Sequence, residues 1–133
     1  MYRSGDESLA TLDIAKINLY SGEISIHKAG SAPTFIRRQG IVKKAECQSL
    51  PLGILRNVNF EKVSSCLKED DILLMMSDGA TSDGTDWIEN ELQNFCGSAE
   101  KLCDLIASKA KLKRGENRSD DITVCAAIIR KNV

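Results

Sequence analysis

The chain is poor in the residues that build zinc sites and disulfide frameworks. It has one histidine, His27, and an odd set of cysteines with no Cys-x-x-Cys spacing: Cys47, Cys66, Cys96, Cys103 and Cys125. Neither a zinc site nor a disulfide framework is indicated. Cys103 and Cys125 have apolar neighbours, so we expect both to be small buried hydrophobes in a reducing compartment. A catalytic cysteine and histidine pair is disfavoured, because a free buried cysteine is the ordinary case. His27 falls on the opposite face of a strand pattern from Ile24 and Ile26, so we expect it at the surface or as a satisfied core residue rather than as a base.

Aromatic residues and surplus charge are also scarce. The chain has three Phe, two Tyr and one Trp, and 18 basic residues against 19 acidic residues give a net charge of −1. Because the chain has no basic surplus and few aromatic side chains on which bases could stack, we do not expect nucleic acid as a ligand. No apolar run approaches the roughly 20 residues that cross a bilayer, and the polar first six residues do not form a signal peptide. We therefore expect a soluble, cytoplasmic chain without a membrane segment.

Strand patterns dominate the first half of the chain, which has the length and composition of a single domain over residues 1–133. Alternating segments on either side of short turns predict two hairpins, with turns at 20–22 and at Gln39-Gly40. A rigid loop is expected at 51–54. The expected strand segments are, in chain order, 9–17, 23–28, 34–37, 41–43, 58–63, 72–74 and 122–129.

Two helices are predicted between the last two strands. Asp86 and Glu89 have the spacing of a capping box, and a helical apolar pattern follows. Ser98 is a suitable N-cap for the second helix, and Gly115 should end it. The basic cluster at 111–114 suits the negative end of that helix and also leaves open the binding of a phosphate or an acidic partner. Strands, two helices and a final strand indicate an α+β fold.

Acidic residues stand at the ends of two apolar runs. Asp78 follows the run that begins at Ile72 and leads directly into Gly79, and Asp120 and Asp121 precede the run at 122–129. Carboxylates fixed by strand ends suit hard cations such as Mg²⁺ or Mn²⁺. Asp-Gly is equally a common turn signal. The spacing alone therefore leaves both a metal ligand and a turn open.

Five motifs in order carry a resemblance to a known family. They lie at 12–13, 28–38, 50–54, 71–79 and 120–124. In this order they resemble the PP2C-type (PPM) metal-dependent serine/threonine phosphatases, and within them the phosphatase domain of the stage II sporulation protein E type. The resemblance implies an antiparallel β-sandwich flanked by helices, incomplete at the N-terminus. The chain would then be the C-terminal portion of a PP2C-like phosphatase domain.

The same resemblance implies a metal centre. Asp78 and Asp120 match metal ligands, Gly79 would let the backbone approach metal-bound water, and Asp121 and Ser77 would support the ligands from a second layer. The metals would be Mn²⁺ or Mg²⁺, two in an intact domain. No catalytic group beyond a metal-bound water is implied.

The resemblance further implies a substrate, a phosphoserine protein of the anti-sigma-factor antagonist type. Lys28 and Arg37 are candidate substrate contacts. The family's early Asp-Gly-Met-Gly motif has no counterpart here, so we expect at most one bound metal and little hydrolysis by this chain alone. Asp83 and Asp13 are weaker candidates for further ligands.

The missing early strands lead us to expect an exposed sheet edge that is covered by a homodimer or another chain. Two other functions remain open at this stage. One is a non-catalytic regulatory or interaction module of the same fold, and the other is an α+β domain whose aspartates only make turns.

Overall fold

The computed structural model describes residues 11–29, 32–46, 61–115 and 121–131. These residues belong to two compact units, one drawn from Met1–Ser31 with Glu46–Cys66 and the other from Ala32–Ala45 with Leu67–Val133. Each unit is described by itself below. That the two form a single domain stays a prediction.

The first unit is an antiparallel sheet in the order β1-β2-β5, built from β1 (Leu12–Ile17), β2 (Glu23–Ala29) and β5 (Glu61–Cys66). The turn between β1 and β2 is held by the side chain of Asn18, whose Oδ1 accepts from the backbone N–H groups of Tyr20 and Ser21 at 2.9 and 3.2 Å. This turn fixes the register that places Ile17 opposite Ile24. The predicted first hairpin is confirmed.

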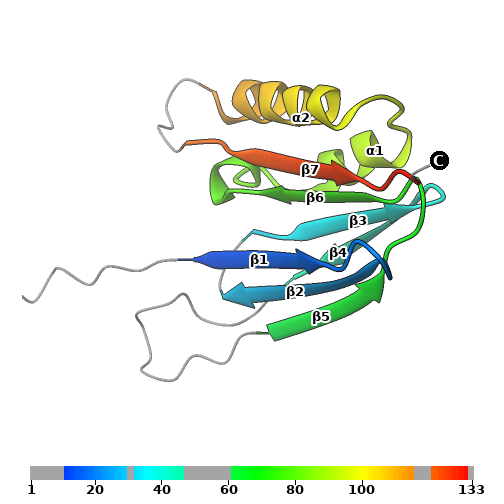
Figure 1. Cartoon of the computed structure of the whole chain (residues 1–133). Helices are drawn as coiled ribbons and strands as arrows, with labels where there is room; N and C mark the ends of the chain where they lie inside the picture. The colour runs from blue at the N-terminus through cyan, green and yellow to red at the C-terminus, as the bar shows by residue number, and fades with distance from the viewer. Residues whose placement is uncertain (1–10, 30–31, 47–60, 116–120, 132–133) are drawn as a thin grey trace, which may run out of the picture. The chain divides into compact units, whose positions relative to one another are not determined.

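The second unit contains a four-stranded antiparallel sheet in the order β4-β3-β6-β7 (Figure 1). Its strands are β3 (Thr34–Arg38), β4 (Ile41–Ala45), β6 (Ile72–Met76) and β7 (Val124–Ile128). The second predicted hairpin joins β3 and β4, and its turn contains Gln39 and Gly40 at positive φ. The long connection that follows returns the chain to the other edge of β3, so that β6 becomes an inner strand with four buried residues out of five.

Two helices complete the second unit: α1 (Asp86–Gln93) and α2 (Ala99–Arg114), preceded by the short 3₁₀ helix η1 (Asp78–Ala80). α2 lies against β7 and η1. As predicted, the Ser98 hydroxyl accepts from the Lys101 N–H at 3.2 Å, and Gly115 ends α2 at a φ of 69°. The buried core joins one face of the sheet to both helices, through Ala32, Phe35, Ile72, Leu74, Met76, Ala80, Ile88, Leu92, Leu102, Ile106 and Ala110.

Several local predictions need correction. The N-cap of α1 is Thr85, whose side chain makes no capping bond, and Asp86 is already the first helical residue, so the predicted capping box is wrong. Cys125 is exposed rather than buried, because its neighbours in β7 take the core-facing positions. The strand expected at 58–63 is described over 61–66, so it extends three residues further than expected, and residues 58–60 lie outside the described residues. The loop expected at 51–54 lies outside the described residues.

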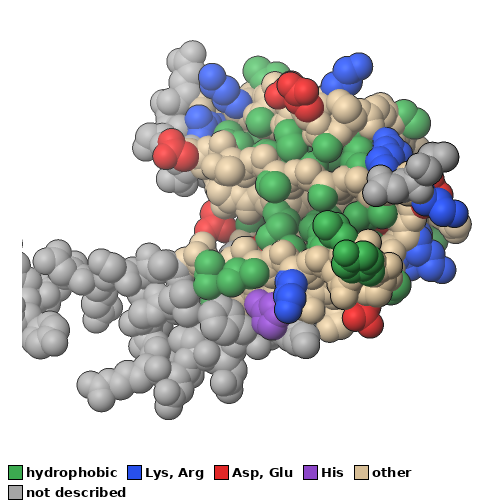
Figure 2. All heavy atoms as spheres, in the orientation of Figure 1, with side chains coloured by type: hydrophobic (Ala, Val, Ile, Leu, Met, Phe, Trp, Pro, Cys, Tyr) green, Lys and Arg blue, Asp and Glu red, His purple; other side chains and the backbone are tan. Residues whose placement is uncertain are grey.

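The predicted α+β class is confirmed, with two antiparallel sheets and two helices. Neither helix of the described ranges combines the length and the apolar character needed to cross a bilayer. Figure 2 shows Lys and Arg side chains at several places on the visible surface of the described residues. This distribution agrees with a chain whose net charge is −1.

Candidate functional site

Asp78 stands where β6 ends and the chain turns outward. The Ser77 carbonyl accepts from the Ala80 N–H at 3.0 Å, and the Asp78 carbonyl accepts from the Thr81 N–H at 3.1 Å. These two bonds form η1 directly after the strand. Asp78 is exposed and Gly79 is buried beneath it. A carboxylate therefore projects to solvent from a turn that is anchored in the core.

The segment before β7 is tied to this turn through Ser77. The Ser77 N–H donates to the Thr123 carbonyl at 2.9 Å, and the Thr123 N–H donates to Ser77 Oγ at 2.8 Å. The Ser77 hydroxyl in turn donates to the Asp121 carbonyl at 3.2 Å. The structure thus brings together the backbones of the two acidic motifs, which are more than 40 residues apart in sequence.

The predicted metal ligands are only partly within the described residues. Asp78 is described, whereas Asp120 lies outside the described ranges. Asp121 is exposed, and so is Asp83, a weaker candidate, which follows η1. Among the described residues, no three acidic, histidine or cysteine side chains gather closely enough to hold an ion. The donor chemistry at Asp78 fits a hard cation, and the described residues supply part of a ligand set.

Gly79 is the middle residue of η1 and is buried. Its φ is not positive. Backbone conformation therefore does not require a glycine here. The predicted role, close approach of the backbone to metal-bound water, stays a prediction.

Lys28 is placed differently from the sequence expectation of a substrate contact. Its side chain is completely buried, and Nζ lies 2.6 Å from the Asp13 carboxylate on the neighbouring strand. A buried ammonium needs such a partner, because removing it from water costs on the order of several kcal/mol. Lys28 and Asp13 form an ion pair within the first unit, and the contact of Lys28 with a substrate and the role of Asp13 as a further ligand stay predictions.

Arg37, the other candidate substrate contact, closes the end of α1. Its Nη1 donates to the carbonyls of Leu92 and Phe95 at 3.0 and 2.5 Å. Leu92 lies in the last turn of α1, where carbonyls lack helical donors and the dipole is negative, and Phe95 follows the C-cap Asn94. The guanidinium therefore has a structural role, and its contact with a substrate stays a prediction.

Sequence reasoning missed the environment of Asp71, at the start of β6. Asp71 is almost fully buried, and its Oδ2 accepts from Arg38 Nε at 2.9 Å, from Arg38 Nη2 at 2.6 Å and from the Lys68 N–H at 2.8 Å. This two-pronged pairing joins the ends of β3 and β6. The only sequence signal was an acidic residue directly before an apolar run, which does not identify its partner.

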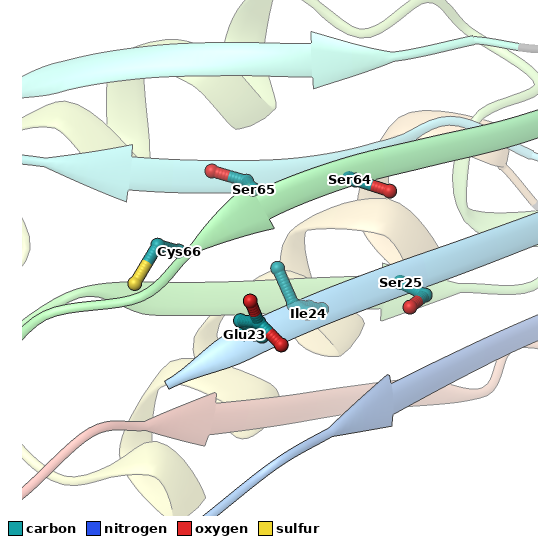
Figure 3. A pocket seen from close by; sticks show the side chains of 6 residues that line it. All are labelled: Glu23, Ile24, Ser25, Ser64, Ser65 and Cys66. Atoms are coloured by element: carbon teal, nitrogen blue, oxygen red, sulfur yellow. The ribbon is translucent and has the colours of Figure 1, made fainter. Parts of the chain in front are cut away.

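The first unit has an open groove of about 450 Å³ over the β2–β5 pair (Figure 3). Register places Ser25 opposite Ser64 and Glu23 opposite Cys66. The groove is lined by Glu23, Ile24, Ser25, Ser64, Ser65 and Cys66. It holds one carboxylate and none of the predicted site residues, so it does not provide a second candidate for the metal centre.

Comparison with known proteins gives a consistent result. The sequence profile of the stage II sporulation protein E family matches residues 1–130. Stage II sporulation protein E of Priestia megaterium is 33% identical over 98% of this chain. The structure of the PP2C phosphatase domain with a fragment of the regulatory domain of SpoIIE from Bacillus subtilis superposes with a TM-score of 0.81, at 31% identity over 98% of the chain.

A further solved structure is the phosphatase domain of the same Bacillus subtilis protein, presoaked with Mn. It has a TM-score of 0.76 and 30% identity over 93% of this chain. The present chain spans 23% of the Priestia megaterium protein, 41% of the structure with the regulatory fragment and 58% of the Mn-presoaked structure. It therefore corresponds to a part of each relative, and the matched architecture is the PP2C phosphatase fold.

Proposed function

The chain belongs to the stage II sporulation protein E family, and from this membership we propose that it carries part of the active site of a PP2C-type, metal-dependent serine phosphatase. The observation that carries the proposal is the turn after β6. It presents the exposed Asp78 carboxylate and is hydrogen-bonded through Ser77 to the acidic segment before β7. This is where the family resemblance expects metal ligands.

Asp78 and Asp120 would hold a divalent cation, Mn²⁺ or Mg²⁺. Carboxylate oxygens are the ligands that these hard ions prefer. When bound, such ions lower the pKa of a coordinated water and neutralise the charge of a phosphoryl group. Two carboxylates carry two negative charges, which suits one divalent ion, so we expect at most one to bind to this chain.

The contribution of the chain itself is placement. η1 holds Asp78 at the surface, and the buried Gly79 and Ala80 anchor that turn in the core. Asp121 follows directly after the proposed ligand Asp120, and its backbone is fixed by Ser77. No side chain of this chain is proposed as a nucleophile.

We propose a phosphoserine protein of the anti-sigma-factor antagonist type as the substrate, acted on in the cytoplasm. The support is the family membership and the sporulation proteins that the chain resembles. Phosphoserine carries close to two negative charges near neutral pH. A site that holds a divalent cation at an exposed turn matches that charge.

The test is hydrolysis of a phosphoserine protein in the presence of Mn²⁺, by this chain and by a version extended upstream. We expect turnover in the extended version, and Asp78→Asn and Asp120→Asn should each lower it at least a hundredfold. Asp104→Asn, which removes an exposed carboxylate on α2, is the matched control and should keep the activity. Equal activity in the extended version and its three variants would contradict the proposal.

A non-catalytic interaction module is the second candidate function. The observation in its favour is the β1–β2 turn, where Leu19 is 90% exposed and Tyr20 is completely exposed. The bonds to Asn18 hold this turn in one conformation, so the two side chains are presented at little entropic cost.

We propose a second copy of this chain as the partner in that case, paired along an outer strand of the first sheet. Sedimentation tests this directly. A dimer that Tyr20→Ser dissociates supports the module, and a monomer at all concentrations contradicts it.

A further inference from the structure

We propose that Ser77 is a positioning residue whose hydroxyl holds the acidic segment before β7 against the turn that carries Asp78. The significance of this role for a metal site rests on the proposed function, whereas the geometry rests on hydrogen bonds within one unit of the structure. Those bonds show why a hydroxyl is needed at this position.

The first step concerns the end of the β6–β7 ladder. In an antiparallel pair, residues that face each other at a hydrogen-bonded position exchange two N–H to carbonyl bonds. Ser77 and Thr123 keep one of them, from the Ser77 N–H to the Thr123 carbonyl at 2.9 Å. The Ser77 carbonyl is instead used by η1, where it accepts from the Ala80 N–H at 3.0 Å. The Thr123 N–H therefore needs another acceptor.

In the second step, the Ser77 side chain supplies the missing acceptor. Ser77 Oγ accepts from the Thr123 N–H at 2.8 Å, in place of the carbonyl that has turned away. The same hydroxyl donates to the Asp121 carbonyl at 3.2 Å. A hydroxyl can accept and donate at once, which an alanine methyl cannot do. β6 can thus end, and Asp78 can turn outward, while the chain before β7 remains attached.

The third step is the consequence for the two acidic motifs. Asp121 is held one residue after the proposed ligand Asp120, and Ser77 is directly before Asp78. One side chain therefore limits how far the two motifs can separate. Residues that orient metal ligands in this way commonly change metal affinity by about tenfold or more when they are removed.

Thr81 offers a matched control in the same turn. Its Oγ1 donates to the Asp78 carbonyl at 3.2 Å, a bond that stays within the turn and does not reach the β7 segment. Thr81→Val removes a hydroxyl of the same kind and should weaken the turn alone. Ser77→Thr keeps the hydroxyl at position 77 and should retain the wild-type behaviour.

The first readout is amide hydrogen exchange of the metal-free 133-residue chain by NMR. Ser77→Ala should speed exchange of the Thr123 N–H by about tenfold, as expected for the loss of one hydrogen bond. Thr81→Val and Ser77→Thr should leave that rate within about twofold of wild type. An unchanged Thr123 rate in Ser77→Ala would overturn the inference whether or not the chain binds metal.

The second readout is Mn²⁺ affinity by calorimetry on the same proteins, measured where each is folded. Ser77→Ala should weaken Mn²⁺ binding by about tenfold, Ser77→Thr should retain the wild-type affinity, and Thr81→Val should weaken binding by clearly less than Ser77→Ala does. If Ser77→Ala and Thr81→Val lose stability equally and bind Mn²⁺ equally, the hydroxyl supports the fold only, and the positioning role is wrong.

Two further variants keep the outcomes separable. If Asp78→Asn binds Mn²⁺ as wild type does, the proposed function fails, and the exchange rates still decide whether Ser77 holds the segment. If Ser77→Ala does not fold, Ser77→Cys replaces it in both measurements. Its longer, weaker hydrogen bonds should give an intermediate exchange rate, and a rate equal to that of wild type would contradict the inference.

Discussion

Arg37 provides the sharpest test of the structural account, because this candidate substrate contact is hydrogen-bonded within the fold. One guanidinium nitrogen donates to two carbonyls at the end of α1, at 3.0 and 2.5 Å. Hydrogen bonds that involve a charged group contribute about 1.5 to 3 kcal/mol each when they are well shielded. Arg37 is half-buried, so water screens part of this gain. We expect Arg37→Ala to lower the free energy of unfolding by about 2 kcal/mol in total.

The assay is urea unfolding followed by circular dichroism. With a slope of about 2 kcal/mol per molar urea, the midpoint should fall by about 1 M while the slope stays constant. Arg130→Ala is the control, since Arg130 pairs with Asp70 and both side chains are mostly exposed. That change should cost less than about 0.5 kcal/mol. If Arg37→Ala costs no more than Arg130→Ala, the stabilising role assigned to Arg37 is refuted.

Three further changes follow from the same structure. Asp71→Ala should cost about 1.5 kcal/mol in urea unfolding, because it removes the hydrogen bonds from Arg38 and from the Lys68 N–H to an almost fully buried carboxylate, while the exposed part of Arg38 is screened by water; a loss under about 0.5 kcal/mol would contradict that pairing. Ser98→Ala should cost about 1 kcal/mol by removing the N-cap bond of α2, measured by thermal unfolding, and an unchanged melting temperature would speak against the cap. Burial raises the pKa of the Cys103 thiol, so at pH 8 iodoacetamide should modify Cys103 more slowly than the exposed Cys96, with the difference narrowing toward pH 10; equal rates at pH 8 would be the contrary result.

Local patterns in the sequence predicted the elements whose causes are themselves local. Alternation of apolar residues around a short turn gave both hairpins, because each turn also fixes its register. The N-cap at Ser98 and the stop at Gly115 depend on single residues with well-defined backbone preferences. The strand expected to end at 63 continues to Cys66, because its pairing with β2 extends as far as Glu23 opposite Cys66.

Partners distant in sequence could not be predicted in this way. The carbonyls that Arg37 contacts lie 55 and 58 residues further along the chain, and nothing near Arg37 identifies them. The burial of Lys28 has the same origin, because its position in an alternating strand does not show what will cover it. For the candidate site, the motifs gave Asp78 and Ser77. Only the structure shows that the Ser77 hydroxyl accepts from the Thr123 N–H, in place of the Ser77 carbonyl.

The most direct test of the central claim is calorimetric titration of Mn²⁺ into the 133-residue chain and into its Asp78→Asn variant. The account predicts one weak binding event in the chain and its loss in the variant, because Asn keeps the shape of the side chain and removes the charge. Asp104→Asn, which changes an exposed carboxylate on α2, is measured alongside and should bind as the unaltered chain does. Binding that is unchanged in Asp78→Asn would contradict the account and leave Asp78 as a turn residue.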